Sequence, residues 1–176
     1  MNLIFLAIII GEIAFWIFLV SGLLLRYVWG LNKLSIILLA STPLIDIFLL
    51  IITFIDLSNG TKPHFFHGLS ATYIGFSITY GHKTIKWADQ WAAYKWASGE
   101  RPEKKKLHGK EKVKYQWREF SRFFVCAVII LTLVGIAFFI VPFEDTFWLI
   151  YWVVNIIGTV IIWLVFGPVK SILNNK

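Results

Sequence analysis

The chain has 176 residues, of which 58% are hydrophobic and only 15% charged. This composition excludes an ordinary water-soluble domain, which holds about 45–50% apolar residues because water must wet its surface. The net charge of +7 comes from residues 83–122, which carry twelve Lys and Arg against five Asp and Glu. Because no nucleic-acid-binding motif accompanies this charge, we attribute it to a cytoplasmic membrane loop and expect no nucleic-acid partner.

Long apolar runs predict the membrane spans. Four runs reach the roughly 20 residues that a helix needs to cross a bilayer: residues 3–25, 34–57, 123–141 and 147–166. A fifth run, residues 65–81, is shorter and rich in Gly, Ser and Thr. If it also crosses, sixteen of the seventeen Lys and Arg residues fall on one side and Lys62 alone on the other, as the positive-inside rule requires.

We therefore predict an all-α fold, a polytopic transmembrane bundle of five spans with amphipathic cytoplasmic helices. The N-terminus is expected outside a cell membrane and the C-terminus in the cytoplasm. Three regions follow from this reading: the first three spans in residues 1–82, a basic amphipathic cytoplasmic segment in residues 83–122, and the last two spans with a short tail in residues 123–176.

Two carboxylates fall inside the first two spans. Glu12 and Asp46 lie about 14 and 18 Å into their helices, from opposite sides, and so near the midplane. A charge there is costly, and desolvation favours the neutral acid. One reading is structural, a protonated carboxyl bonded to a neighbour such as the backbone that Pro43 frees. The other reading is a proton or cation path, with His82 and Asp89 at its inner end.

At the outer face, Asp56 ends the second span while His64 and His67 open the third. These residues predict either a hydrogen-bonded Asp/His group or, more weakly, a divalent metal site. The single cysteine, Cys126, excludes a cysteine-built metal site. The spacing of His67 and His82 resembles that of two-haem membrane cytochromes, but no other span offers a histidine as a second ligand. We therefore expect no cofactor.

Two further patterns concern packing and the membrane surface. Small residues recur along one side of the third span at Gly68, Ala71 and Gly75, which predicts a close approach of a neighbouring helix. Beyond that span, aromatic residues recur at i, i+4 and i+7 with lysines around them; they are Trp87, Trp91 and Tyr94. A basic helix with an aromatic face is expected to contact anionic headgroups or to pack on the inner end of the bundle.

Several short stretches together resemble the YmcC-type bacterial integral membrane proteins. They are residues 41–46, 55–57, 67–69, 73–75, 81–82 and 87–89, within a similar region of about 20–102. The resemblance implies a bacterial cytoplasmic membrane and a polytopic helical fold, and it implies no mechanism. It places five titratable residues at matching positions, and Glu12 lies outside it; the five are Asp46, Asp56, His67, His82 and Asp89.

The sequence is compatible with three classes of function. The first is a non-enzymatic component that assembles with or modulates a membrane partner or a second copy of itself. The second is a small proton- or cation-coupled translocator that uses the midplane carboxylates. The third is a metal-dependent membrane enzyme with an outer Asp/His site. The sequence contains no nucleophile elbow, phosphate loop or HExxH motif, which favours a role without catalysis.

Overall fold

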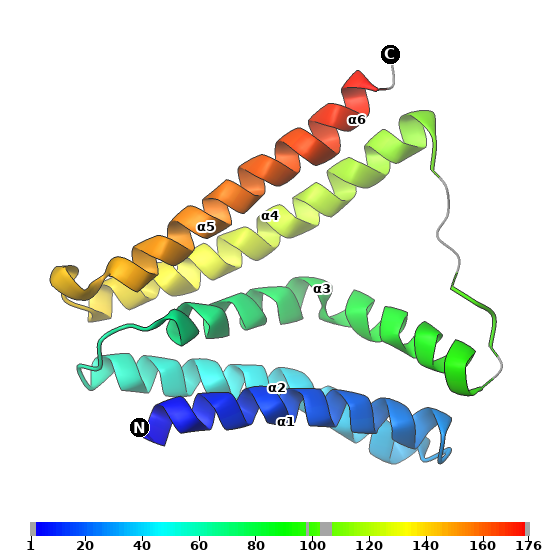
Figure 1. Ribbon diagram of the computed structural model, residues 1–176, viewed down its shortest axis with the longest axis horizontal. Helices are drawn as coiled ribbons and strands as arrows, with labels where there is room; N and C mark the ends of the chain where they lie inside the picture. Colours follow the sequence, from blue (N-terminus) through cyan, green and yellow to red (C-terminus); the bar gives the residue numbers. More distant parts are fainter. Residues whose placement is uncertain (1–2, 98, 103–106, 175–176) are drawn as a thin grey trace. The chain divides into compact units, whose positions relative to one another are not determined.

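The computed structural model describes residues 3–97, 99–102 and 107–174, and it describes the side chains of all of these except residues 3–5, 7, 8 and 12. Over these residues the chain is helical and has no strand (Figure 1). The elements are α1 (Leu3–Tyr27), α2 (Asn32–Ser58), α3 (Phe65–Trp96), α4 (Gly109–Ile140), the 3₁₀ turn η1 (Phe143–Asp145), α5 (Phe147–Leu164), the π-helical turn η2 (Val165–Val169) and α6 (Lys170–Leu173). The predicted all-α fold is confirmed.

Four helical stretches are long and apolar enough to cross a membrane: Ile9–Tyr27, Asn32–Ser58, Gly109–Ile140 and Phe147–Leu173. The chain is therefore a multi-pass membrane protein. The predicted third crossing lies in α3, whose 32 residues extend over about 48 Å. That length exceeds the roughly 30 Å of the hydrocarbon core, although the helix is less apolar than the other four. Its crossing rests on the charge argument and stays a prediction.

The first compact unit contains α1, α2 and the part of α3 from Phe76 onward. Glycines allow α1 and α2 to pack closely: a Cβ on Gly11 would lie 2.5 Å from Leu49 Cδ2, and one on Gly22 would lie 2.9 Å from Leu39 Cγ. Pro43 lies inside α2 and cannot donate a hydrogen bond to the Leu39 carbonyl one turn earlier. The Thr42 hydroxyl donates to that carbonyl instead, at 2.9 Å, so the defect is satisfied within α2.

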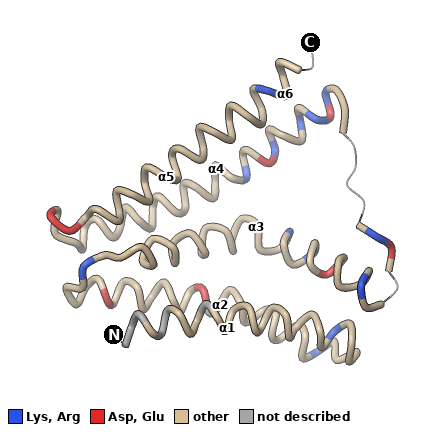
Figure 2. Tube along the Cα trace, viewed as in Figure 1, with Lys and Arg blue, Asp and Glu red and all other residues tan. Residues whose placement is uncertain are grey.

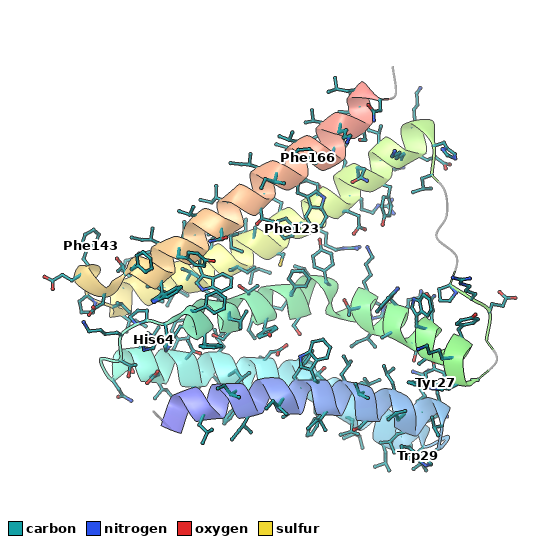
Figure 3. The ribbon with its side chains drawn as sticks, in the orientation of Figure 1. Tyr27, Trp29, His64, Phe123, Phe143 and Phe166 are labelled. Atoms are coloured by element: carbon teal, nitrogen blue, oxygen red, sulfur yellow. The ribbon has the colours of Figure 1, made fainter. Side chains whose placement is uncertain are left out.

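The second unit contains α4, α5, the helical turns after α5 and the first part of α3, through Gly75. Its core lies along α4, where Cys126, Ile130 and Val134 are at most 2% exposed. Phe123 of α4 (Figure 3) stacks on Trp163 of α5 with ring centres 4.6 Å apart. Figure 2 shows the charged residues of α4 gathered in its first turns and no charge along α5. This pattern fits two helices whose apolar lengths lie in lipid.

The predicted regions divide the chain differently from the helices. The boundaries at residues 82 and 122 each fall inside a continuous helix, α3 and α4 respectively. Neither boundary carries a proline, and the glycine at position 81 is helical. A change from apolar to basic composition therefore marks a change of surroundings along one helix, and it does not mark the end of that helix.

Candidate functional site

Among the described side chains of the first unit, the most deeply buried ionisable group is the carboxyl of Asp46 in α2, a residue that is 4% exposed. The Ser77 hydroxyl of α3 donates to Asp46 Oδ2 at 2.7 Å. No Lys or Arg among the described residues forms an ion pair with this carboxyl. The structural reading gave the backbone freed by Pro43 as one example of a neighbour for Asp46; the described partner is instead the Ser77 hydroxyl, and the freed Leu39 carbonyl accepts the Thr42 hydroxyl. The side chain of Glu12 lies outside the described residues.

A second polar group joins the end of α1 to the second half of α3. Arg26 Nη1 lies 3.0 Å from Asp89 Oδ1, and Tyr27 (Figure 3) also hydrogen-bonds the Asp89 side chain. Arg26 lies over the Tyr27 ring, 5.6 Å from its centre. Asp89 is therefore an ion-paired residue that links two helices. His82, the other predicted inner residue, is exposed on α3 and belongs to neither group.

The outer residues that predicted a metal site have partners close to them in sequence. The Asp56 carboxylate is 5% exposed and accepts a hydrogen bond from the Thr61 hydroxyl at 2.7 Å. His67 Nδ1 accepts the backbone N–H of His64 at 2.9 Å, and the His67 N–H donates to the His64 carbonyl at 3.1 Å. This reciprocal pair closes the start of α3 in the manner of a capping box.

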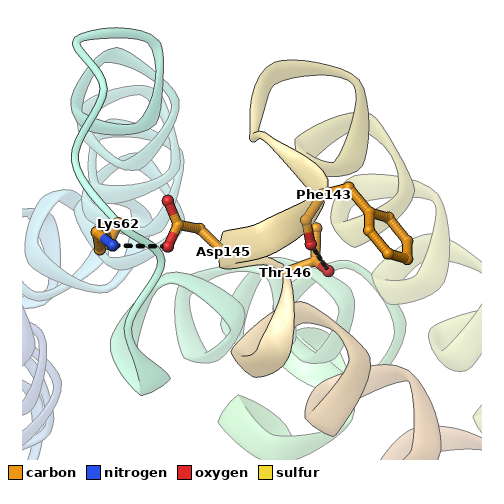
Figure 4. A network of polar contacts seen from close by, with 4 residues as sticks. All are labelled: Lys62, Phe143, Asp145 and Thr146. Atoms are coloured by element: carbon orange, nitrogen blue, oxygen red, sulfur yellow. Dashed lines mark hydrogen bonds and ion pairs between the residues drawn. The ribbon is translucent and has the colours of Figure 1, made fainter.

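No group of three or more His, Cys, Asp or Glu side chains is placed to hold a metal ion within the described ranges. Near the start of α3, a further ion pair joins Lys62 to Asp145 of η1, with Nζ and Oδ1 2.9 Å apart (Figure 4). The Thr146 hydroxyl beside it donates to the Phe143 carbonyl at 2.8 Å. In the second unit, the ion pair joins the segment before α3 to the turn between α4 and α5, and the hydrogen bond of Thr146 lies within that turn.

The small residues of α3 lie against the α4–α5 pair in the second unit. Gly68 faces the indole ring of Trp152 so closely that any side chain there would overlap it. The same indole donates its Nε1–H to the Phe65 carbonyl at 2.9 Å. A Cβ on Gly75 would lie 2.5 Å from Ile130 Cγ1 and 3.2 Å from the backbone oxygen of Cys126. Ala71, between the two glycines, is 3% exposed.

The aromatic stripe (Trp87, Trp91 and Tyr94) follows the surface of the second half of α3. Successive rings contact edge to face, with centres 6.3 and 5.9 Å apart. Trp87 is 58% exposed and Tyr94 39% exposed, whereas Ala92 is 4% exposed. The helix thus turns Asp89 and Ala92 inward within the first unit and the stripe outward.

Sequence reasoning missed Asn155, the ninth of the eighteen residues of α5. The Asn155 side chain is exposed although the helix around it is apolar, and its Nδ2 donates to the Tyr151 carbonyl at 2.9 Å. Thr159, one turn later, is also exposed, and nothing lies within 4 Å of a Cβ built on Gly158. The available signal was that Asn155 is the one side-chain amide within the predicted fifth span.

Comparison with known proteins adds one relative. No family model matches the chain, and no solved structure matches it. The chain is 47% identical over 90 residues to the uncharacterized membrane protein YmcC of Bacillus subtilis (strain 168), and the aligned region covers 51% of this chain and 49% of YmcC. The matched region is thus about half the length of that relative, whose name states no activity. The predicted resemblance is confirmed: over half its length, this multi-pass membrane protein is similar to YmcC.

Proposed function

We propose that the chain is a non-enzymatic membrane component that assembles, through the Asn155 face of α5, with a helix of another membrane protein or of a second copy. This face comprises Asn155, Gly158 and Thr159. The exposed amide of Asn155 carries the proposal. A side-chain amide offers two donor hydrogens and an acceptor oxygen, and the bond to Tyr151 uses one hydrogen.

The position of Asn155 makes exposure to lipid unfavourable. From the ends of α5 it is about 12–14 Å along the axis, which is near the middle of a hydrocarbon core. Lipid tails offer no hydrogen bonds there, and polar side chains on membrane helices accordingly bond across helix interfaces. Gly158 and Thr159 are small, so a neighbouring backbone can approach the amide closely.

The polar contacts between segments also favour an architectural role. Each of the three pairs described above joins separate elements: Asp46 with Ser77, Arg26 with Asp89, and Lys62 with Asp145. Removing one partner of such a contact leaves the other polar group without that bond, which is destabilising where the group is buried. These contacts support a scaffold for assembly more directly than they support a reaction.

Replacing Asn155 with leucine is expected to weaken this assembly about threefold to thirtyfold, since interhelical polar contacts contribute about 0.6–2 kcal/mol. Complexes extracted from native membranes would be measured by light scattering and mass spectrometry, with tagged and untagged copies to reveal self-association. Val154→Leu, at an exposed apolar position of α5, is the matched control. A wild-type protein that is monomeric and free of partners would contradict the proposal.

We also propose the orientation with the N-terminus outside and the C-terminus in the cytoplasm, which the distribution of Lys and Arg supports. A reporter fused after residue 176, or inserted between residues 104 and 109, is expected to behave as cytoplasmic. The same reporter inserted at Asn59–Gly60 is expected to behave as external. Equal behaviour of the reporters at 59–60 and 104–109 would show that α3 does not cross.

A proton-coupled translocator is the second candidate, and the pair of Asp46 and Ser77 favours it. This carboxyl is buried, its described partner is an uncharged hydroxyl, and such a group can exist as a neutral acid that exchanges a proton. Flux that depends on pH in liposomes containing the purified protein would support this activity.

A further inference from the structure

The aromatic stripe lies beside the end of α1, where the apolar stretch that can span a membrane ends. Arg26 and Tyr27 form the last turn of α1, at the end of the span Ile9–Tyr27, and both contact Asp89 of α3. Asp89 therefore lies level with the end of that stretch. Trp87 and Trp91 are each two positions from Asp89, about 3 Å along the helix axis. The stripe thus lies in the zone of the lipid headgroups, where tryptophan and tyrosine are enriched.

The charges around the stripe have one sign. Asp89 is the one acidic residue between positions 83 and 99, and it is paired with Arg26. At about 100° per residue, Lys83 lies in line with the stripe, while Lys86 and Lys95 flank it on opposite sides. All three lysines are exposed. The outward surface of this part of α3 is therefore aromatic and cationic, and Asp89 lies on the opposite side of the helix.

We propose that this surface, formed by the aromatic stripe with Lys83, Lys86 and Lys95, binds anionic phospholipid headgroups at the membrane boundary. The lysine ammonium groups bind the lipid phosphates, and the aromatic rings insert among the glycerol and upper acyl groups. Charge complementarity selects the occupant, because cationic side chains beside interfacial aromatics match an anionic bilayer surface. The contact between Arg26 and Asp89 holds the second half of α3 at the depth that this binding requires.

The test is lipid retention by the purified full chain in mild detergent, with native mass spectrometry used to count bound phosphatidylglycerol and phosphatidylcholine. Wild-type protein is expected to retain phosphatidylglycerol preferentially. Combining Lys83→Gln, Lys86→Gln and Lys95→Gln should weaken that retention by about tenfold or more, since each lysine near the surface contributes about fivefold. The matched control combines Lys110→Gln, Lys112→Gln and Lys114→Gln, which removes the same charge from exposed positions of α4, and it should lose about twofold or less.

A second measurement does not depend on the lysine variants. Brominated phosphatidylglycerol is expected to quench the tryptophan fluorescence of wild-type protein more than that of a Trp87→Phe, Trp91→Phe variant. Equal losses in the two lysine triples, or equal quenching in the two proteins, would overturn the proposal. Loss of a co-purifying protein from the α3 triple, with lipid retention unchanged, would also overturn it and assign the surface to a protein partner.

Discussion

Replacing Gly75 with leucine is expected to lower the free energy of unfolding by about 1–3 kcal/mol, the usual effect of overpacking a tight contact. The first added carbon would already lie 2.5 Å from Ile130 Cγ1 and 3.2 Å from the backbone oxygen of Cys126. Ile130 is 1% exposed and Cys126 is completely buried, so neither can move aside without disturbing the core of the second unit. Thermal unfolding in detergent would measure the loss.

Gly135→Leu is the matched control, because it makes the same chemical change on α4 at a site where nothing lies within 4 Å of a new Cβ. Glycine is a poor helix former in comparison with leucine. The control is therefore expected to keep the wild-type unfolding temperature or to raise it slightly. If Gly75→Leu and Gly135→Leu unfold at the same temperature, the contact between α3 and α4 is not tight.

Helices were predictable from the sequence because bilayer length and apolar composition restrict a spanning chain to few structures. The lengths of α3 and α4 were harder to predict, since hydropathy changes where a helix leaves lipid even when the helix continues. Residues 83–96 belong to the same helix as residues 65–81. The aromatic periodicity of residues 83–96 is visible in the sequence. That they continue the helix of the predicted third span is seen only in the structure.

The contacts of the candidate residues were less predictable than the residues themselves. Ser77 is 31 positions from Asp46, and no local pattern links the two. The partner of Asp89 is Arg26, which lies 63 positions earlier in the sequence, and no local pattern distinguishes it from the other cations. By contrast, His64 and His67 are three residues apart, and a capping role at a helix start was accessible to sequence reasoning. The candidate residues could thus be identified from the sequence, whereas partners that are distant in the sequence could not.

Replacing Asp46 with asparagine is expected to leave stability nearly unchanged, because the amide oxygen can still accept the Ser77 hydroxyl, as a neutral carboxylic acid does. Asp46→Leu removes that acceptor from a site that is 4% exposed. The unpaired hydroxyl and the altered shape are expected to cost about 1–3 kcal/mol. Thermal unfolding of the three proteins in one detergent would measure both effects.

Activity separates the two roles of Asp46. A carboxyl that binds and releases a proton cannot be replaced by an amide, so Asp46→Asn should abolish pH-dependent flux in liposomes while the protein remains folded. A purely structural carboxyl should tolerate asparagine in every assay. Asp46→Asn thus distinguishes translocation from assembly, and the Asn155→Leu variant tests assembly independently of it.

The protonation state of Asp46 can be measured directly by the infrared carboxyl band of the purified protein between about pH 5 and about pH 9, the range in which buried carboxyls of this kind titrate. We expect a neutral carboxylic acid band that Asp46→Asn removes; this control is needed because Glu12 is a second carboxyl in an apolar span. Arg26 could have kept Asp46 ionised, but it is paired with Asp89, and the described partner of Asp46 is the Ser77 hydroxyl. If Asp46→Asn changes no neutral-acid band anywhere in that range, Asp46 is permanently ionised, and both the neutral-acid bond to Ser77 and the proton-carrying role must be abandoned.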